Sequence, residues 1–144
     1  MTIAAAQTIR LAGPDGVQEE FLVASGATLK PGMLVRRTSA TECNVHATSG
    51  GDGATLILHE DALQGLGVDD SAAAATRVYA EYVTPGAKRY ARLKANENVS
   101  VGDHLISGGD GTLIKTTGSP VKVFAICEEA SNVATQQLIQ VRFI

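Results

Sequence analysis

Tryptophan is absent from this sequence, and aromatic residues make up only 4% of its 144 residues. The core must therefore be built from Ala, Val, Leu and Ile. No apolar run approaches the ~20 residues that cross a bilayer, so no membrane partner is expected. The N-terminus lacks the basic start and long apolar stretch of a signal peptide, which predicts synthesis in the cytoplasm.

Neither sign of charge dominates the chain. Twelve Lys and Arg stand against 15 Asp and Glu, for a formal net charge of −3. No global field would therefore draw the protein to nucleic acid. The two cysteines, Cys43 and Cys127, are too few for a disulfide scaffold. We expect two buried, reduced thiols, although their spacing leaves a bridge between them open.

The sequence also lacks the common catalytic and cofactor motifs: Gly-x-Ser-x-Gly, a phosphate loop and Cys-x-x-Cys. None of its three histidines, His46, His59 and His104, has a partner at a recognisable zinc-ligand spacing. The run His59–Asp61 is the best metal candidate, but we expect a solvated strand end. The sequence therefore predicts a non-enzymatic protein with no catalytic residue, metal ligand, cofactor or small-molecule substrate.

The most basic stretch holds Lys88, Arg89, Arg92 and Lys94, with Tyr90 among them. A basic strand with an aromatic platform is one way to bind single-stranded nucleic acid. Because aromatics are scarce and the net charge is negative, we expect instead a solvated strand face, with contact to an acidic protein as the second option. No direct nucleic-acid partner is predicted.

What the sequence does contain is the pentapeptide Ser-Gly-Gly-Asp-Gly, twice, at 49–53 and 107–111. A second pair of similar segments follows the two copies, Leu-His-Glu-Asp-Ala at 58–62 and Ile-Cys-Glu-Glu-Ala at 126–130. Glycines flanking an Asp supply the positive φ angles of tight reversals. Each copy has one carboxylate, too few for a calcium loop. The pattern predicts two β-hairpins and an internal pseudo-repeat.

Short alternating segments recur at roughly 8–12-residue spacing, separated by turn signals such as Lys30-Pro31-Gly32 and Thr84-Pro85-Gly86. The expected strands lie near 8–11, 20–24, 33–37, 43–46, 56–59, 77–83, 89–94, 99–106, 121–127 and 139–144. This predicts an all-β fold, a small barrel or sandwich of short antiparallel strands with hairpin turns.

Two parts of the chain depart from this regularity. Residues 1–12 read as an extended N-terminal arm, ahead of a single barrel-like domain over 13–144. Residues 61–76 are the least strand-like segment and are expected to hold at most a short helix. Asp69-Asp70-Ser71 would cap one helical turn over Ala72–Ala75.

Three segments, taken in order, carry a resemblance to a known family. Ala24–Val35 resembles an "a-G-x-x-x-x-x-G-x-x-V" turn into a strand, and Val99–Leu113 a "V-x-x-G-D-x-L-x-S-x-x-D-G-x-L" hairpin. Val123–Ala130 followed by Leu138–Ile144 resembles an "A-x-A-x-E-A … I-x-V-x-x" ending. Together they resemble the small capsid decoration, or cement, proteins of tailed bacteriophages, over most of the chain from Ala24. The longer 61–76 segment and Cys127 depart from the pattern.

The resemblance implies a structural virion protein that binds the outer surface of the capsid. Its partner would be the major capsid protein, whose neighbouring copies it would hold together. Self-association as a dimer or trimer is also implied, and the resemblance does not decide between them. The arm Met1–Gln7 would pair with or drape over a neighbour. The residues that contact the capsid or another subunit are not predicted.

Other functions remain open at this point. One is a non-enzymatic β-barrel binding module for a peptide, a glycan or a partner domain. Another is a different virion component, in a tail or fibre. A small enzyme or carrier domain would require a titratable cluster in a cleft, which the sequence does not offer.

Overall fold

The computed structural model describes residues 7–144, and over these residues the chain is all-β, as predicted. Residues 1–6 of the expected arm lie outside the described part. The elements are β1 (Arg10–Ala12), β2 (Val17–Val23), β3 (Thr28–Leu29), β4 (Val35–Arg37), β5 (Glu42–Val45), β6 (Leu56–His59), the 3-10 turn η1 (Ala62–Gln64), β7 (Ala72–Ala73), β8 (Arg77–Tyr82), β9 (Lys88–Leu93), β10 (Asn98–Val99), β11 (His104–Ser107), β12 (Leu113–Lys115), β13 (Ala125–Cys127), β14 (Ser131–Asn132) and β15 (Gln137–Phe143).

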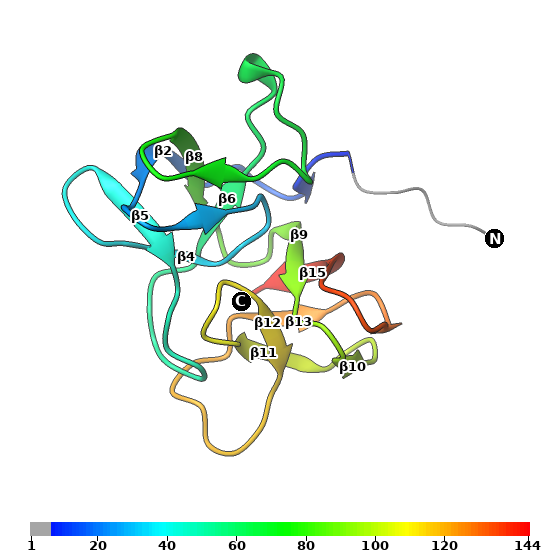
Figure 1. Ribbon diagram of the computed structural model, residues 1–144. Coiled ribbons are helices and arrows are strands. Elements are labelled where there is room, and N and C mark those ends of the chain that lie inside the picture. The colour runs from blue at the N-terminus through cyan, green and yellow to red at the C-terminus, as the bar shows by residue number, and fades with distance from the viewer. Residues whose placement is uncertain (1–6) are drawn as a thin grey trace.

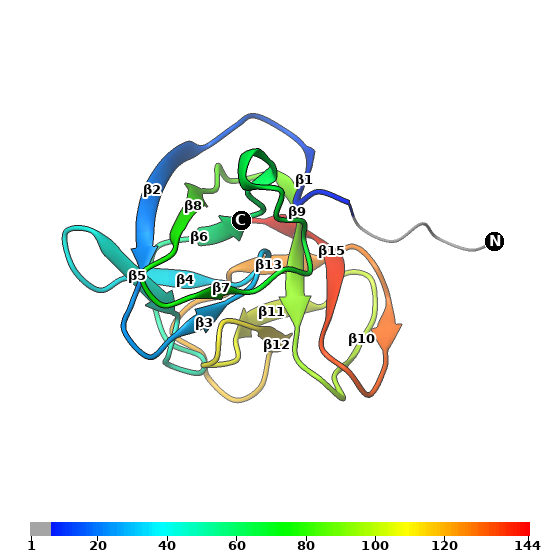
Figure 2. The ribbon, with the colours of Figure 1, turned by 45° about the horizontal axis from the view of Figure 1, so that its top comes forward.

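The C-terminal strands form a closed five-strand barrel. Its order is β9-β12-β11-β13-β15, and β15 pairs back onto β9 along the length of that strand. The strand β1 adds to the free edge at the start of β9 (Figure 2). Closure pairs the strands of the barrel with one another, and β1 covers the edge that remains at the start of β9.

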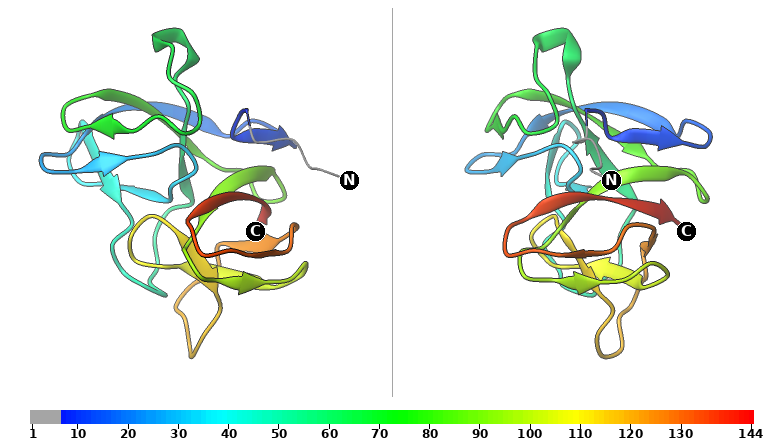
Figure 3. Two further views of the ribbon diagram at one scale, coloured as in Figure 1. Left: turned by 45° about the vertical axis from the view of Figure 1, so that its right-hand side comes forward. Right: turned by 90° about the vertical axis from the view of Figure 1, so that its right-hand side faces the viewer.

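The N-terminal strands form a curved half-barrel in the order β4-β5-β2-β8-β6. An isolated bridge between Leu34 and Ile57 brings the chain before β4 against β6. Figure 1 and the left view of Figure 3 show this sheet stacked on the barrel. Two short ladders, β3 with β7 and β10 with β14, lie outside the main sheets.

The two halves repeat the same strand pairings. In each, the first strand pairs antiparallel with the last (β2 with β8, β9 with β15) and parallel with the fourth (β2 with β5, β9 with β12). The turns before β4 and β11, the third strand of each half, make equivalent hydrogen bonds. Gly32 N–H donates to the Leu58 carbonyl and Gly102 N–H to the Cys127 carbonyl, both at 2.8 Å. We call β2–β8 the first half and β9–β15 the second half.

The pseudo-repeat is present, but its register is not the one that the pentapeptides suggested. The second copy, at 107–111, is the turn of the β11–β12 hairpin, as predicted. The first copy, at 49–53, is not a hairpin turn, because it joins β5 to β6 and those strands do not pair with each other. Instead it packs on the second copy, where Gly50 N–H donates to the Ser107 carbonyl at 2.9 Å.

The downstream pair of similar segments is also displaced. Leu58 pairs with Ala80 in the first half, and the residue that matches it in the second half is Cys127, which pairs with Val141. Alignment of the two similar segments, 58–62 and 126–130, instead matches Leu58 with Ile126. A shift of one residue reverses the face on which each side chain lies, so sequence similarity alone gave the wrong correspondence.

Two apolar clusters hold the fold. One fills the half-barrel and includes Phe21, Val23 and Cys43. The larger one fills the barrel and continues into the contact between the halves, where Ile9 and Ile57 join it. Ile9 is fully buried, which fixes the chain just ahead of β1 against the barrel.

The connection from β6 to β7 differs from expectation. The helical turn lies at Ala62–Gln64, as η1, and Ala72–Ala73 forms β7 rather than part of a helix. Pairing with Thr28–Leu29 explains this, because two alanines gain more from a ladder than from an isolated helical turn. The described residues contain no helix long and apolar enough to cross a membrane.

Local turn chemistry is confirmed where it was clearest. Gly32 and Gly86, each following a proline, have φ angles of +86° and +92°. In each turn an N–H two residues after the proline donates back across it, from Met33 to Lys30 and from Ala87 to Thr84. The strand expected over 121–127 is shorter than predicted and begins at Ala125.

Candidate functional site

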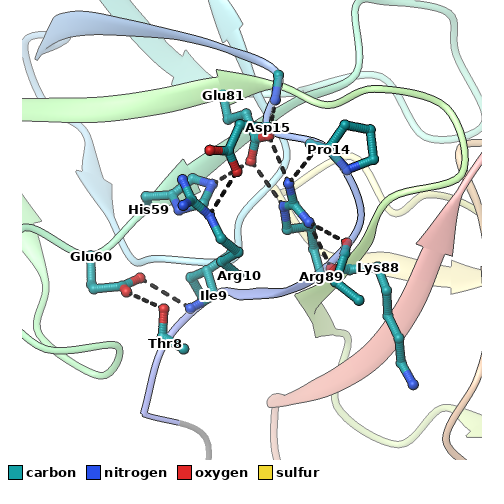
Figure 4. Close-up of polar contacts among 12 residues, drawn as sticks. Thr8, Ile9, Arg10, Pro14, Asp15, His59, Glu60, Glu81, Lys88 and Arg89 are labelled. Carbon is teal, nitrogen blue, oxygen red and sulfur yellow. Dashed lines mark hydrogen bonds and ion pairs between the residues drawn. The ribbon is translucent and has the colours of Figure 1, made fainter.

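A buried polar network joins the two halves of the molecule, and Glu81 on β8 is its centre (Figure 4). Arg89 on β9 donates to both carboxylate oxygens, with Nε–Oε1 and Nη2–Oε2 distances of 3.0 and 2.9 Å. His59 on β6 contacts Oε1 at 2.7 Å, and Gly16 N–H donates to Oε2 at 2.6 Å. The side chains of Glu81 and Arg89 are fully buried, so each charge is compensated by the other inside the fold.

The β1–β2 loop closes over this network. Arg89 Nη1 donates to the Ala12 carbonyl at 2.7 Å and Nη2 to the Pro14 carbonyl at 3.2 Å. On its exposed side, Asp15 of the same loop pairs with Arg10 of β1 at 3.2 Å. The guanidinium of Arg89 therefore ties three chain segments together, and its bonds are those of a structural cross-link.

The same contacts set the protonation of Glu81. Burial by itself would raise the pKa of this carboxyl group. The hydrogen bonds from Arg89, the Gly16 N–H and His59, with the charge of Arg89, outweigh burial and lower the pKa to about 2. Glu81 is thus an anion at neutral pH, and its lone pairs are committed to protein donors.

The metal candidate His59–Asp61 does not assemble into a metal site. His59 turns to Glu81, whereas Glu60 accepts from Thr8 Oγ1 at 2.5 Å and from Ile9 N–H at 3.1 Å. Asp61 accepts from the side chain of Gln64. Within residues 7–144 no group of three His, Cys, Asp or Glu side chains is placed to hold a metal. His59 and Asp61 are also buried rather than solvated as predicted, and each is turned to a partner within the fold, Glu81 and Gln64.

An open groove of about 460 Å³ lies beside the network, between the β6–β7 connection and strands β1, β2 and β8. Its lining is Thr8, Arg10, Gln18, His59, Glu60, Asp61, Ala62, Leu63 and Tyr79. Sequence reasoning missed this groove, because its walls come from four separate segments of the chain.

The other two histidines have different surroundings. His46 is buried between the two pentapeptide loops, with Nδ1 2.7 Å from Ser107 Oγ and Nε2 2.7 Å from the Asp52 carbonyl. It therefore braces the loops against each other. His104 lies at the exposed start of β11.

The cysteines are both buried free thiols, as expected, and they lie in different apolar clusters. This settles the open question of a bridge. Burial raises the pKa of the Cys43 thiol to about 11 and also raises that of Cys127. Neither thiol is therefore activated as a nucleophile at neutral pH.

The basic stretch is not the solvated face that the sequence suggested. Arg89 and Arg92 are buried, with exposed fractions of 0% and 4%. Arg92 donates from Nε to the Pro31 carbonyl at 2.8 Å and from Nη2 to the Val68 carbonyl at 2.5 Å. Two of the four basic side chains in this stretch are thus engaged in internal hydrogen bonds, which weakens the case for a nucleic-acid surface.

Comparison with known proteins gives a match at the level of fold. No protein-family model matches the chain, and no curated protein sequence does. Among solved structures, the chain is similar to the crystal structure of the head fiber gp8.5 N base in bacteriophage phi29, with a TM-score of 0.59 and 15% identity. The likeness covers 89% of this chain and 93% of that one. The two proteins therefore share a fold, an all-β architecture with a closed five-strand barrel and a half-barrel sheet.

Proposed function

We propose that this chain is a structural virion protein of a bacteriophage that binds the outer surface of the capsid and stabilises contacts between neighbouring major capsid proteins. The observation that carries the proposal is the fold shared, over nearly the full length of both chains, with a protein of a phage head. The decoration-family resemblance, found independently in the order of turns and strands, points to the same class of protein.

The chemistry of the buried groups agrees with a structural role. Glu81 and Arg89 are fully buried and bond to each other and to the backbone, and Glu81 also bonds to His59, so neither charged group presents a free position to a substrate. Rigid barrels of this kind suit lattice binding, because many modest contacts repeated over a capsid give high avidity without a deep pocket. We further propose that the chain self-associates as a dimer or trimer.

A second candidate is the base of a fibre, attached to the head and carrying further domains. The similar structure is the N base of a head fiber, which favours this alternative specifically. Both candidates require binding to the capsid. They differ in whether bound protein strengthens the shell.

The test uses DNA-free capsid shells of the phage that encodes the chain. The purified protein, its mass in solution first measured by light scattering, is mixed with shells at rising concentration and sedimented. We expect saturation at a fixed number of copies per shell and a higher melting temperature of the decorated shells. Saturation without stabilisation would favour the fibre base, and a protein that stays in the supernatant would contradict both.

A further inference from the structure

One connection of the first half has no counterpart in the second. Residues 60–71 join β6 to β7, whereas only residues 128–130 join the equivalent strands, β13 and β14. Both halves nevertheless form the same short ladder, β3–β7 and β10–β14. The fold itself therefore does not require the longer connection, which we call the insertion.

The insertion carries an apolar side chain at its tip. Leu63, within η1, is 93% exposed, more than the other large exposed apolar residues, such as Val121 at 73% and Val17 at 70%. Figure 1 and both views of Figure 3 show the insertion projecting from the half-barrel, at the end of the molecule opposite the β12–β13 loop. An apolar tip on a projecting segment is suited to enter a recess in another molecule.

The insertion is held in a defined shape. Leu66 N–H donates to the Asp61 carbonyl at 3.0 Å, and Gly65, with a φ of +74°, donates to the Ala62 carbonyl at 3.0 Å. At the base, Val68 is buried in the main apolar cluster, and its carbonyl accepts from Arg92. Because Leu63 is already positioned before binding, little conformational entropy would be lost on contact.

The charge of the insertion limits its partner. Its four ionisable side chains, Glu60, Asp61, Asp69 and Asp70, are all acidic. Two of them are bonded within the protein, Glu60 to Thr8 and Ile9 and Asp61 to Gln64. Asp69 and Asp70 are exposed at the base, where Asp69 also lies 3.4 Å from the buried guanidinium of Arg92. Like charges on a partner would be repelled, whereas Lys and Arg around an apolar recess would be attracted.

We infer that the insertion is the docking element of this protein, and that it binds a protein surface with an apolar socket bordered by Lys or Arg side chains. The inference rests on the proposed function, which places that socket on the capsid shell. It names the contact residue, Leu63, and the chemistry of its site.

The experiment compares Leu63→Ser with Val121→Ser, a matched removal of an exposed apolar side chain at the other end of the molecule. Both variants keep the fold, because neither side chain is buried. Sedimentation with shells should show Leu63→Ser binding about tenfold more weakly than wild type, and Val121→Ser binding like wild type. Leu63→Met, which retains an apolar tip, should restore most of the binding.

A second arm tests the charge. Raising the salt concentration should weaken binding of the wild-type protein, and Asp70→Asn, which leaves the contact between Asp69 and Arg92 in place, should bind more weakly with a smaller salt effect. Wild-type protein that binds shells while Leu63→Ser binds equally well would overturn this inference and leave the proposed function standing. Wild-type protein that does not bind at all would overturn the proposed function and, with it, the docking of the insertion on a shell.

Discussion

At the scale of single residues, the repeat places opposite charges at matching positions with different burial. Glu81 lies across from Gln18 in the first half, and Arg142 lies across from Lys88 at the matching rung of the second half. Arg142 bonds to Glu128 at the surface, with an exposed fraction of 47%. Glu81 is sealed by the β1–β2 loop, so equivalent positions should contribute very differently to stability.

Glu81→Gln tests this difference. The substitution leaves the buried guanidinium of Arg89 without its counter-charge, and we expect a loss of about 3–5 kcal/mol in the free energy of unfolding. Glu128→Gln removes the partner of exposed Arg142 and should cost less than about 1 kcal/mol. Urea denaturation followed by circular dichroism measures both. Equal losses in the two variants would show that the network is not a buried cross-link.

The pH dependence of stability follows from the same carboxyl group. Its pKa is lowered in the folded protein from an ordinary 4.5 to about 2, so the stabilisation is fully present above about pH 4.5 and is lost as the pH falls toward about 2. Wild type should therefore lose its advantage over Glu81→Gln across this range. Urea midpoints of both proteins at several pH values measure the gap, and a gap that stays constant below about pH 4 would contradict the assignment.

At the scale of elements, the repeat supplies matched turns in different surroundings. The turn at Gly32 packs on the second half, where an added Cβ would lie 2.5 Å from Leu138 Cδ2. The turn at Gly102 faces open space, with nothing within 4 Å of an added Cβ. The turn at Gly32 thus helps to join the halves, whereas Gly102 has no neighbour in the space that a side chain would occupy.

Replacement of each glycine by alanine separates backbone strain from packing. Both residues have positive φ angles, +86° and +95°, so each substitution should cost roughly 1–2 kcal/mol of strain. Gly32→Ala should cost roughly 0.5–1.5 kcal/mol more, because the end of the Leu138 side chain must turn away from its rotamer. Thermal unfolding of the two variants compares them directly. A Gly102→Ala variant as unstable as Gly32→Ala would mean that the contact with Leu138 adds nothing.

Local signals in the sequence predicted local structure well. The alternation over β15 and the Pro-Gly turns at Gly32 and Gly86 needed no distant partner to be read correctly. The strand β8 was predicted too, but its alternation set Glu81 on the face opposite the buried Val78 and Ala80, and Glu81 is fully buried. Arg89 and Arg92 were misread as solvated, because the carbonyls and the carboxylate that hold them come from remote segments, such as Glu81 and Pro31. The groove was missed for the same reason.

At the scale of the whole molecule, two copies of one strand plan are joined into a unit that is not symmetric. The second half closes into a barrel, the first remains a half-barrel, and the main apolar cluster continues between them through Leu34 and Ile57. The insertion at 60–71 is the largest addition to the plan of either half. A rigid body with one projecting, acidic and apolar-tipped element is suited to bind a lattice in a fixed orientation.

The most direct test of the proposed function is an electron cryomicroscopy reconstruction of shells saturated with this protein. We predict density for the barrel and half-barrel on the outer surface, between capsomers, with the insertion directed at the major capsid protein. Shells without added density on their outer surface, at a concentration where the protein is in excess, would contradict the proposed function.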